Sequence, residues 1–201
     1  MRTVESNPLM PAPKESRTYK SDNCSGRAVF LDRDGVLNRN ILRGGKATSP
    51  RTMDEVEITR GAENACNTLR AAGYLLVMVT NQPEIARGIQ NPQTLGEINR
   101  WLCEQLRIHS VKVCPHDDQD DCACRKPKPG MILDAAKELK IDLQQSFLVG
   151  DRWRDVEAGR RAGCRTVLIA CGSEETVELN PDFTAASLAE ASEWILGQAG
   201  R

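Results

Sequence analysis

The stretch Ala28-Val29-Phe30-Leu31-Asp32-Arg33-Asp34-Gly35 decides how the rest of the chain is interpreted. Its four apolar residues are typical of a short strand buried in a sheet. The run ends in Asp32 and Asp34, which can share one side of an extended or tightly turning segment. Two carboxylates at a strand end suit a cation such as Mg²⁺, together with a nucleophilic or acid–base role. The alternative is a solvated surface turn, because D-x-D-G is also typical of turns.

The length and composition of the chain indicate one globular domain with a core. It has 201 residues, of which 40% are hydrophobic and 27% charged, both ordinary values. The net charge of −1 gives no reason to expect nucleic-acid or membrane binding. We find neither an apolar run long enough to cross a bilayer nor the apolar core of a signal peptide. We therefore expect a cytoplasmic monomer.

Apolar runs alternate with helical patterns from residue 27 onwards. Residues 1–26 are polar and proline-containing, without an apolar period, which predicts a flexible tail. Strands are expected at 28–31, 74–79, 111–113, 147–149 and 166–169, and helices at 62–72, 92–106, 132–139, 155–162 and 188–195. The alternation predicts a single α/β domain over 27–201, with a doubly wound, mostly parallel sheet in three layers and no large cap domain.

Polar clusters follow several of these expected strands. They are Asp32 with Asp34, Thr80 with Asn81, and Asp151, while Arg125 and Lys126 open a helix. Strand ends of a parallel sheet lie along one edge, so these side chains should meet. The set suits phosphoryl transfer. A carboxylate that approaches a phosphate is repelled, by about 4 kcal/mol for unit charges about 4 Å apart at a dielectric constant of about 20. Mg²⁺ and a lysine would offset that repulsion.

A glycine-containing basic segment lies between residues 39 and 51. It carries Arg39, Arg43, Lys46 and Arg51. A solvated loop is the simpler interpretation for any single one of these residues. As a set beside the acidic turn, they could attract a phosphorylated ligand, and we take Arg43 as a candidate substrate contact.

Four residues in two close pairs predict a zinc loop over 114–124. Cys114 and His116 form the first pair, and Cys122 and Cys124 the second. Four protein ligands of this type leave no open coordination position, so the site would be structural. A C-x-C disulfide is the alternative, which a reducing compartment disfavours. The remaining cysteines have no paired spacing and are expected to be inert: Cys24, Cys66, Cys103, Cys164 and Cys171.

Four motifs in this order resemble those of the haloacid dehalogenase (HAD) superfamily. They are Asp32-Arg33-Asp34-Gly35, Val79-Thr80-Asn81-Gln82, Arg125-Lys126-Pro127 and Gly150-Asp151. Within the superfamily, the zinc loop is similar to that of the D-glycero-D-manno-heptose 1,7-bisphosphate 7-phosphatases and their relatives, the histidinol-phosphate phosphatases. The resemblance extends from about Arg27 to Cys171.

The resemblance implies a role for each matching residue. Asp32 would be the nucleophile and Asp34 the acid and base. The Asp32 carboxylate, the Asp34 backbone carbonyl and the Asp151 carboxylate would hold Mg²⁺. Thr80 and Lys126 would bind the transferring phosphoryl group. Asn81 and Gln82 would line the pocket, and Arg125 would contact the substrate away from the reacting phosphate.

The substrate expected from this resemblance is heptose 1,7-bisphosphate, cleaved at C7. Histidinol phosphate is the alternative substrate, but it carries a cationic amine, whereas Arg125 and the basic segment suggest a second anion. A zinc-stabilised nucleic-acid-binding module is a third interpretation. The near-neutral net charge and the aromatic content of 4% count against it.

Overall fold

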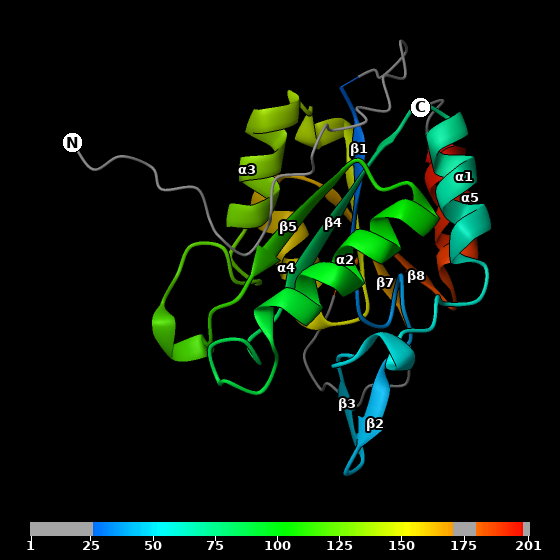
Figure 1. The fold of residues 1–201 in the computed structure, drawn as a ribbon. Helices are drawn as coiled ribbons and strands as arrows, with labels where there is room; N and C mark the ends of the chain where they lie inside the picture. Colours follow the sequence, from blue (N-terminus) through cyan, green and yellow to red (C-terminus); the bar gives the residue numbers. More distant parts are fainter. Residues whose placement is uncertain (1–25, 171–179, 199–201) are drawn as a thin grey trace.

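A six-stranded parallel sheet forms the centre of the molecule (Figure 1). The computed structural model describes residues 26–170 and 180–198, so the predicted tail lies outside the described residues except for Gly26. The strand order is β5-β4-β1-β6-β7-β8, and every neighbouring pair is parallel. The strands are β1 (Ala28–Leu31), β4 (Leu75–Asn81), β5 (Ser110–Cys114), β6 (Phe147–Gly150), β7 (Arg165–Ile169) and β8 (Phe183–Ala185).

Helices cover both faces of this sheet and complete three layers (Figure 1). One face carries α1 (Ala62–Ala71), α2 (Pro92–Leu106) and α5 (Leu188–Gln198), and the other carries α3 (Gly130–Leu139) and α4 (Trp153–Ala162). Strand β1 is apolar throughout because both of its faces are covered: Val29 and Leu31 belong to one core, and Ala28 and Phe30 to the other. The predicted three-layer α/β fold is confirmed.

Two helix ends carry typical capping residues. The Asn91 side chain accepts hydrogen bonds from the backbone amides of Gln93 and Thr94 and so caps α2. After α1, Gly73 has a φ of +87°, a left-handed conformation that favours glycine at the end of a helix. These local signals fix the lengths of the helices and therefore where the intervening strands begin.

The basic segment is a small antiparallel hairpin and not the loop that we expected. Its strands are β2 (Ile41–Arg43) and β3 (Lys46–Thr48), joined through Gly44 and Gly45 at positive φ. Strands of three residues are too short to show a reliable alternation, which is why the sequence did not predict them. Between β1 and α1 the chain forms this hairpin and a 3₁₀ turn, Met53–Glu55, in place of a large cap domain. Two further 3₁₀ turns are Asp118–Asp120 and Leu143–Gln145.

No helix in the described part of the chain is long and apolar enough to cross a membrane.

Candidate active site

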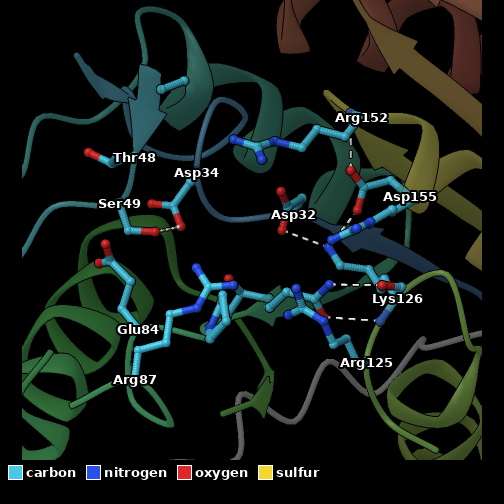
Figure 2. A pocket seen from close by; sticks show the side chains of 15 residues that line it. Asp32, Asp34, Thr48, Ser49, Glu84, Arg87, Arg125, Lys126, Arg152 and Asp155 are labelled. Carbon is cyan, nitrogen blue, oxygen red and sulfur yellow. Dashed lines mark hydrogen bonds and ion pairs between the residues drawn. The ribbon is translucent and has the colours of Figure 1, made fainter. Parts of the chain in front are cut away.

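The carboxyl ends of the strands open into one cleft, shown in Figure 2. Its volume is about 190 Å³, and it is partly open to solvent. Six of the predicted site residues line it: Asp32, Asp34, Thr80, Asn81, Arg125 and Lys126. The parallel strands therefore bring together side chains that lie far apart in the sequence, as the motif positions predicted.

Lys126 lies at the floor of the cleft between two carboxylates (Figure 2). Its Nζ donates to Asp32 Oδ1 at 2.7 Å and to the Val79 carbonyl at 2.9 Å, and it lies 2.5 Å from Asp155 Oδ1. Burial would lower the pKa of Lys126, but Asp155 and Asp32 raise it above its ordinary value. The ammonium is therefore held charged beside Asp32. The sequence interpretation missed Asp155, although an acid in the first turn after Gly150-Asp151 was a usable signal.

Three carboxylates form a site that fits a divalent cation. Single oxygens of Asp32, Asp151 and Asp155 all lie within 4.8 Å of one another. Asp151 Oδ1 is buried and has no hydrogen-bond partner. Burial, with help from the neighbouring acids, raises the pKa of Asp32 to about 7 against the opposing charge of Lys126. Burial and Asp155 raise the pKa of Asp151 to about 6. A cation that prefers oxygen ligands, such as Mg²⁺, would reduce the electrostatic repulsion between these buried carboxylates.

Two glycines permit this close approach of backbone and carboxylates. Gly35 has a φ of +86°, and a Cβ there would lie 2.2 Å from Asp151 Oδ2. A Cβ at Gly150 would lie 2.1 Å from the Cβ of Asp155. Both positions therefore exclude side chains, because real Cβ atoms do not approach other atoms so closely.

Asp34 is surrounded by hydrogen-bond donors. Oδ1 accepts from Asn38 at 3.0 Å, and Oδ2 accepts from Ser49 and Gln82, both at 2.8 Å. Arg33, which is fully buried, forms an ion pair with the same carboxylate at 3.0 Å. Burial alone would raise the pKa of Asp34, but Arg33 and the hydrogen bonds from Asn38 and Ser49 lower it. The sequence interpretation gave no role to Arg33, Asn38 or Ser49.

Asn81 positions the segment that carries the lysine. Its side-chain oxygen accepts from the Lys126 amide and its nitrogen donates to the Lys126 carbonyl, each at 3.0 Å. The Asn81 side-chain amide thus hydrogen bonds to both backbone groups of Lys126, as a neighbouring strand would. It connects the end of β4 to the segment that follows the cysteine cluster.

The four predicted zinc ligands lie together, just before Arg125 and Lys126 in the chain. One atom from each of Cys114, His116, Cys122 and Cys124 lies within 4.8 Å of the others. Cys124 Sγ is 3.2 Å from Cys114 Sγ and 3.3 Å from His116 Nδ1. The cysteines are free thiols in the structure, so the alternative C-x-C disulfide is not formed. Three thiols and an imidazole are a donor set that fits zinc.

Arginines line the mouth of the cleft and are held by acids of the zinc loop. Arg125 Nε donates to Asp118 Oδ1 at 2.7 Å, and Arg154 Nη1 lies 3.6 Å from the same oxygen. Arg87 forms an ion pair with Asp117 at 2.5 Å. The mouth is therefore suited to an anionic ligand, and Figure 2 shows Arg87 and Arg125 on the side of the cleft opposite Arg152.

Comparison with known proteins agrees with this geometry. A family model described as HAD-hydrolase-like matches residues 123–191. A D-glycero-beta-D-manno-heptose-1,7-bisphosphate 7-phosphatase of Pasteurella multocida is 38% identical over 185 residues, covering 85% of this chain and 97% of its own. The chain belongs to the heptose 1,7-bisphosphate 7-phosphatase family. The relative from Chlorobaculum tepidum is 37% identical over 87% of this chain and 96% of its own.

A solved member of this family has the same fold. It is the D,D-heptose 1,7-bisphosphate phosphatase from B. bronchiseptica, determined in complex with magnesium and phosphate. It superposes with a TM-score of 0.72 at 31% identity and covers 86% of this chain and 99% of that one.

Two of the residues that we predicted to bind substrate do not line the cleft of this heptose-phosphatase family member. Arg43 does not line the cleft. Its guanidinium instead donates to Thr48 Oγ1 and the Ser49 carbonyl and pairs with Glu55, so it supports the hairpin. Gln82 is buried behind the cleft, where its amide donates to Asp34 and Thr80. Both predictions located the correct region but not the direction of the side chain.

The cysteines outside the zinc loop are poor nucleophiles where the structure describes them. Burial raises the pKa of Cys66, Cys103 and Cys164 to about 12, so their reactive thiolate forms are scarce at neutral pH. Cys24 and Cys171 lie outside the described residues.

Proposed function

We propose that the protein is a Mg²⁺-dependent phosphatase that removes the C7 phosphate of D-glycero-D-manno-heptose 1,7-bisphosphate. The observation that carries the proposal is the carboxylate of Asp32, 2.7 Å from the Lys126 ammonium at the floor of an arginine-rimmed cleft. A carboxylate nucleophile needs positive charge nearby when it approaches a phosphate dianion. The names of the relatives support the substrate.

In the first proposed step, a carboxylate oxygen of Asp32 attacks the phosphorus of the C7 phosphate. The bond between phosphorus and the sugar oxygen breaks, and its electron pair stays on that oxygen. Asp34 gives a proton to the leaving oxygen, which departs as the sugar hydroxyl. The product of this step is an aspartyl-phosphate on Asp32.

In the second proposed step, a water oxygen attacks the phosphorus of the aspartyl-phosphate. Asp34, now ionised, accepts a proton from that water. The bond between phosphorus and Asp32 breaks, its electron pair returns to the carboxylate, and inorganic phosphate leaves. The Lys126 ammonium and the Thr80 hydroxyl would contact the phosphoryl oxygens in both steps.

The metal ligands proposed are the carboxylates of Asp32 and Asp151 and the backbone carbonyl of Asp34, while Asp155, the third carboxylate of the cluster, pairs with Lys126. When bound, Mg²⁺ would supply positive charge that offsets the repulsion between nucleophile and phosphate. Asp151 Oδ1 is buried and has no hydrogen-bond partner, which supports this assignment. Zinc at the four-residue cluster of 114–124 is proposed to be structural, and it would fix the loop that leads into Arg125 and Lys126.

The second phosphate of the substrate is assigned to Arg125. This side chain is held beside Lys126 by Asp118 and by the His116 carbonyl. Its planar guanidinium can bind a phosphate through two hydrogen bonds. A substrate with anions at both ends would thus be bound at the floor by Lys126 and at the mouth by Arg125.

A phosphate-release assay over a panel of substrates tests the proposal. The panel contains both anomers of heptose 1,7-bisphosphate, sugar monophosphates and histidinol phosphate, each with Mg²⁺ and with a chelator. We expect the highest kcat/KM for a heptose bisphosphate and loss of activity in chelator. A preference for histidinol phosphate would replace the proposed substrate. No hydrolysis of any ester, with retained RNA binding, would overturn the proposed activity.

A further inference from the structure

We propose that Arg33 is a positioning residue that fixes the orientation of the Asp34 carboxylate during turnover, an inference that rests on the proposed function. Arg33 is the largest of the fully buried side chains in the described part of the chain. A buried guanidinium is costly to remove from water and persists only where a counter-charge and hydrogen bonds compensate it. The counter-charge and hydrogen-bond partners of Arg33 therefore indicate its role.

The contacts of Arg33 connect Asp34 to helix α2. Its Nε donates to Asp34 Oδ1 at 3.2 Å, and its Nη2 donates to Oδ1 and Oδ2 at 3.1 Å and 3.0 Å. Its third nitrogen, Nη1, donates to the side-chain oxygen of Asn99 at 2.9 Å. Asn99 belongs to α2 and is itself buried. The carboxylate is thus connected to a helix of the scaffold through a rigid, planar group.

The other side-chain donors to Asp34 described in the structure are Ser49, Asn38 and Gln82, the last of which directly follows β4. Ser49 comes from the segment just after the hairpin, and Asn38 from the turn after β1 (Ser49 is seen beside Asp34 in Figure 2). Each of these offers one hydrogen bond to one oxygen. Only Arg33 contacts both oxygens among these donors, so it restricts rotation of the carboxylate. A lysine has a single ammonium and cannot bind both oxygens and Asn99 in this planar arrangement.

The orientation of Asp34 should matter differently for the two chemical steps. A p-nitrophenolate leaving group departs without a proton, so attack of Asp32 on p-nitrophenyl phosphate does not need Asp34. The following attack of water on the aspartyl-phosphate needs Asp34 as the base whatever the first leaving group was. A positioning defect should therefore slow the second step and spare the first, whereas general damage to the cleft should slow both.

The experiment is a rapid-mixing measurement of p-nitrophenolate release by wild type and Arg33→Lys with Mg²⁺. We expect the variant to release about one equivalent per site in a burst, at a rate within about threefold of the wild-type first step. The steady-state rate that follows should fall at least about tenfold, since acid–base groups contribute about 10²–10⁴-fold when correctly placed. Arg39→Lys is the matched control, because the exposed Arg39 pairs with Glu57 outside the cleft.

A second variant keeps the test decisive if Arg33→Lys does not fold. Asn99→Ala removes the anchor of Arg33 on α2 without contacting Asp34. It should produce the same separation of the two steps, with a smaller fall in the steady-state rate. Equal slowing of burst and steady state in a folded variant, or unchanged kinetics, would overturn the inference.

Failure of the proposed function would look different. If wild-type protein forms no phosphorylated intermediate, or if Asp32→Asn keeps its activity, the phosphatase mechanism fails before Arg33 is tested. If wild type forms the intermediate normally and the Arg33→Lys and Asn99→Ala variants show the same kinetics as wild type, the mechanism stands and the role of Arg33 is refuted.

Discussion

At the scale of single residues, charges that are buried together define the chemistry of the cleft. Asp32 and Asp155 contact the same lysine, while Asp34 contacts Arg33. The pKa of Asp32 is raised by burial and that of Asp34 is lowered by its arginine, so two carboxylates separated by one residue have different environments. Perturbed pKa values of this kind are typical of functional sites. The lowered pKa of Asp34 favours its ionised form, which suits the proposed base of the second step, and a bound cation would favour the ionised form of Asp32 that a nucleophile needs.

Substitution of Arg125 should change substrate selectivity. If its guanidinium binds the distal phosphate, Arg125→Ala should lower kcat/KM for a sugar bisphosphate about ten- to a hundredfold, from a charged contact of about 1.5–3 kcal/mol. A monophosphate without the second anion should be affected little. Steady-state kinetics on both substrates, with Arg39→Ala as the surface control, decide the matter. Equal losses on both substrates would mean that Arg125 supports the structure of the site and does not select the substrate.

Residue identity was more predictable from the sequence than side-chain direction. Motifs at strand ends located Asp32 and Asp34, because parallel topology alone brings such positions to one edge, and the motif expected to open a helix located Lys126. Arg43 and Gln82 do not line the cleft in the structure, since a motif or a charge pattern does not specify which way a side chain turns. Arg33 was overlooked as a buried group for the same reason. An arginine between two acids suggests solvent exposure until the helix that covers it is known.

At the scale of elements, strand ends carry the reactive groups and short loops fix their distances. Asn81, at the end of β4, hydrogen bonds to both backbone groups of Lys126. The residue before Arg125 is the zinc-loop residue Cys124, so the cysteine cluster constrains one end of the same segment. The hairpin and β8 escaped prediction because strands of three residues carry too little pattern. Longer elements such as α2 and β4 were predictable from their periodicity.

Removal of zinc should disturb the phosphatase site through this segment. We expect about one zinc per chain in protein purified without added metal, because comparable structural sites in peptides bind with about 10–16 kcal/mol of apparent free energy. Elemental analysis measures the content, and hydrogen exchange measures whether residues 114–126 lose protection when zinc is chelated. Cys122→Ser should lose the metal, whereas Cys103→Ser, outside the cluster, should retain it. Folded and active protein with almost no zinc would contradict the assignment.

At the scale of the whole molecule, three packed layers leave one open edge for chemistry. The two hydrophobic cores lie on opposite faces of a sheet whose central strand is β1 next to β4 and β6. That central position explains why Asp32 is buried yet reaches the cleft, since it follows the most covered strand. The mouth of the cleft is formed by residues of several loops, so substrate selectivity can reside in residues separate from the reacting groups.

The most direct test of the central claim, that Asp32 is the nucleophile of a phosphatase, is phosphate release by Asp32→Asn. The amide is close in shape to the carboxylate but a far poorer nucleophile. Hydrolysis of heptose 1,7-bisphosphate is measured with Mg²⁺ for wild type and variant, and circular dichroism checks that both are folded. We predict that a folded variant has no measurable turnover. Turnover close to that of wild type would remove Asp32 from the mechanism and contradict the account.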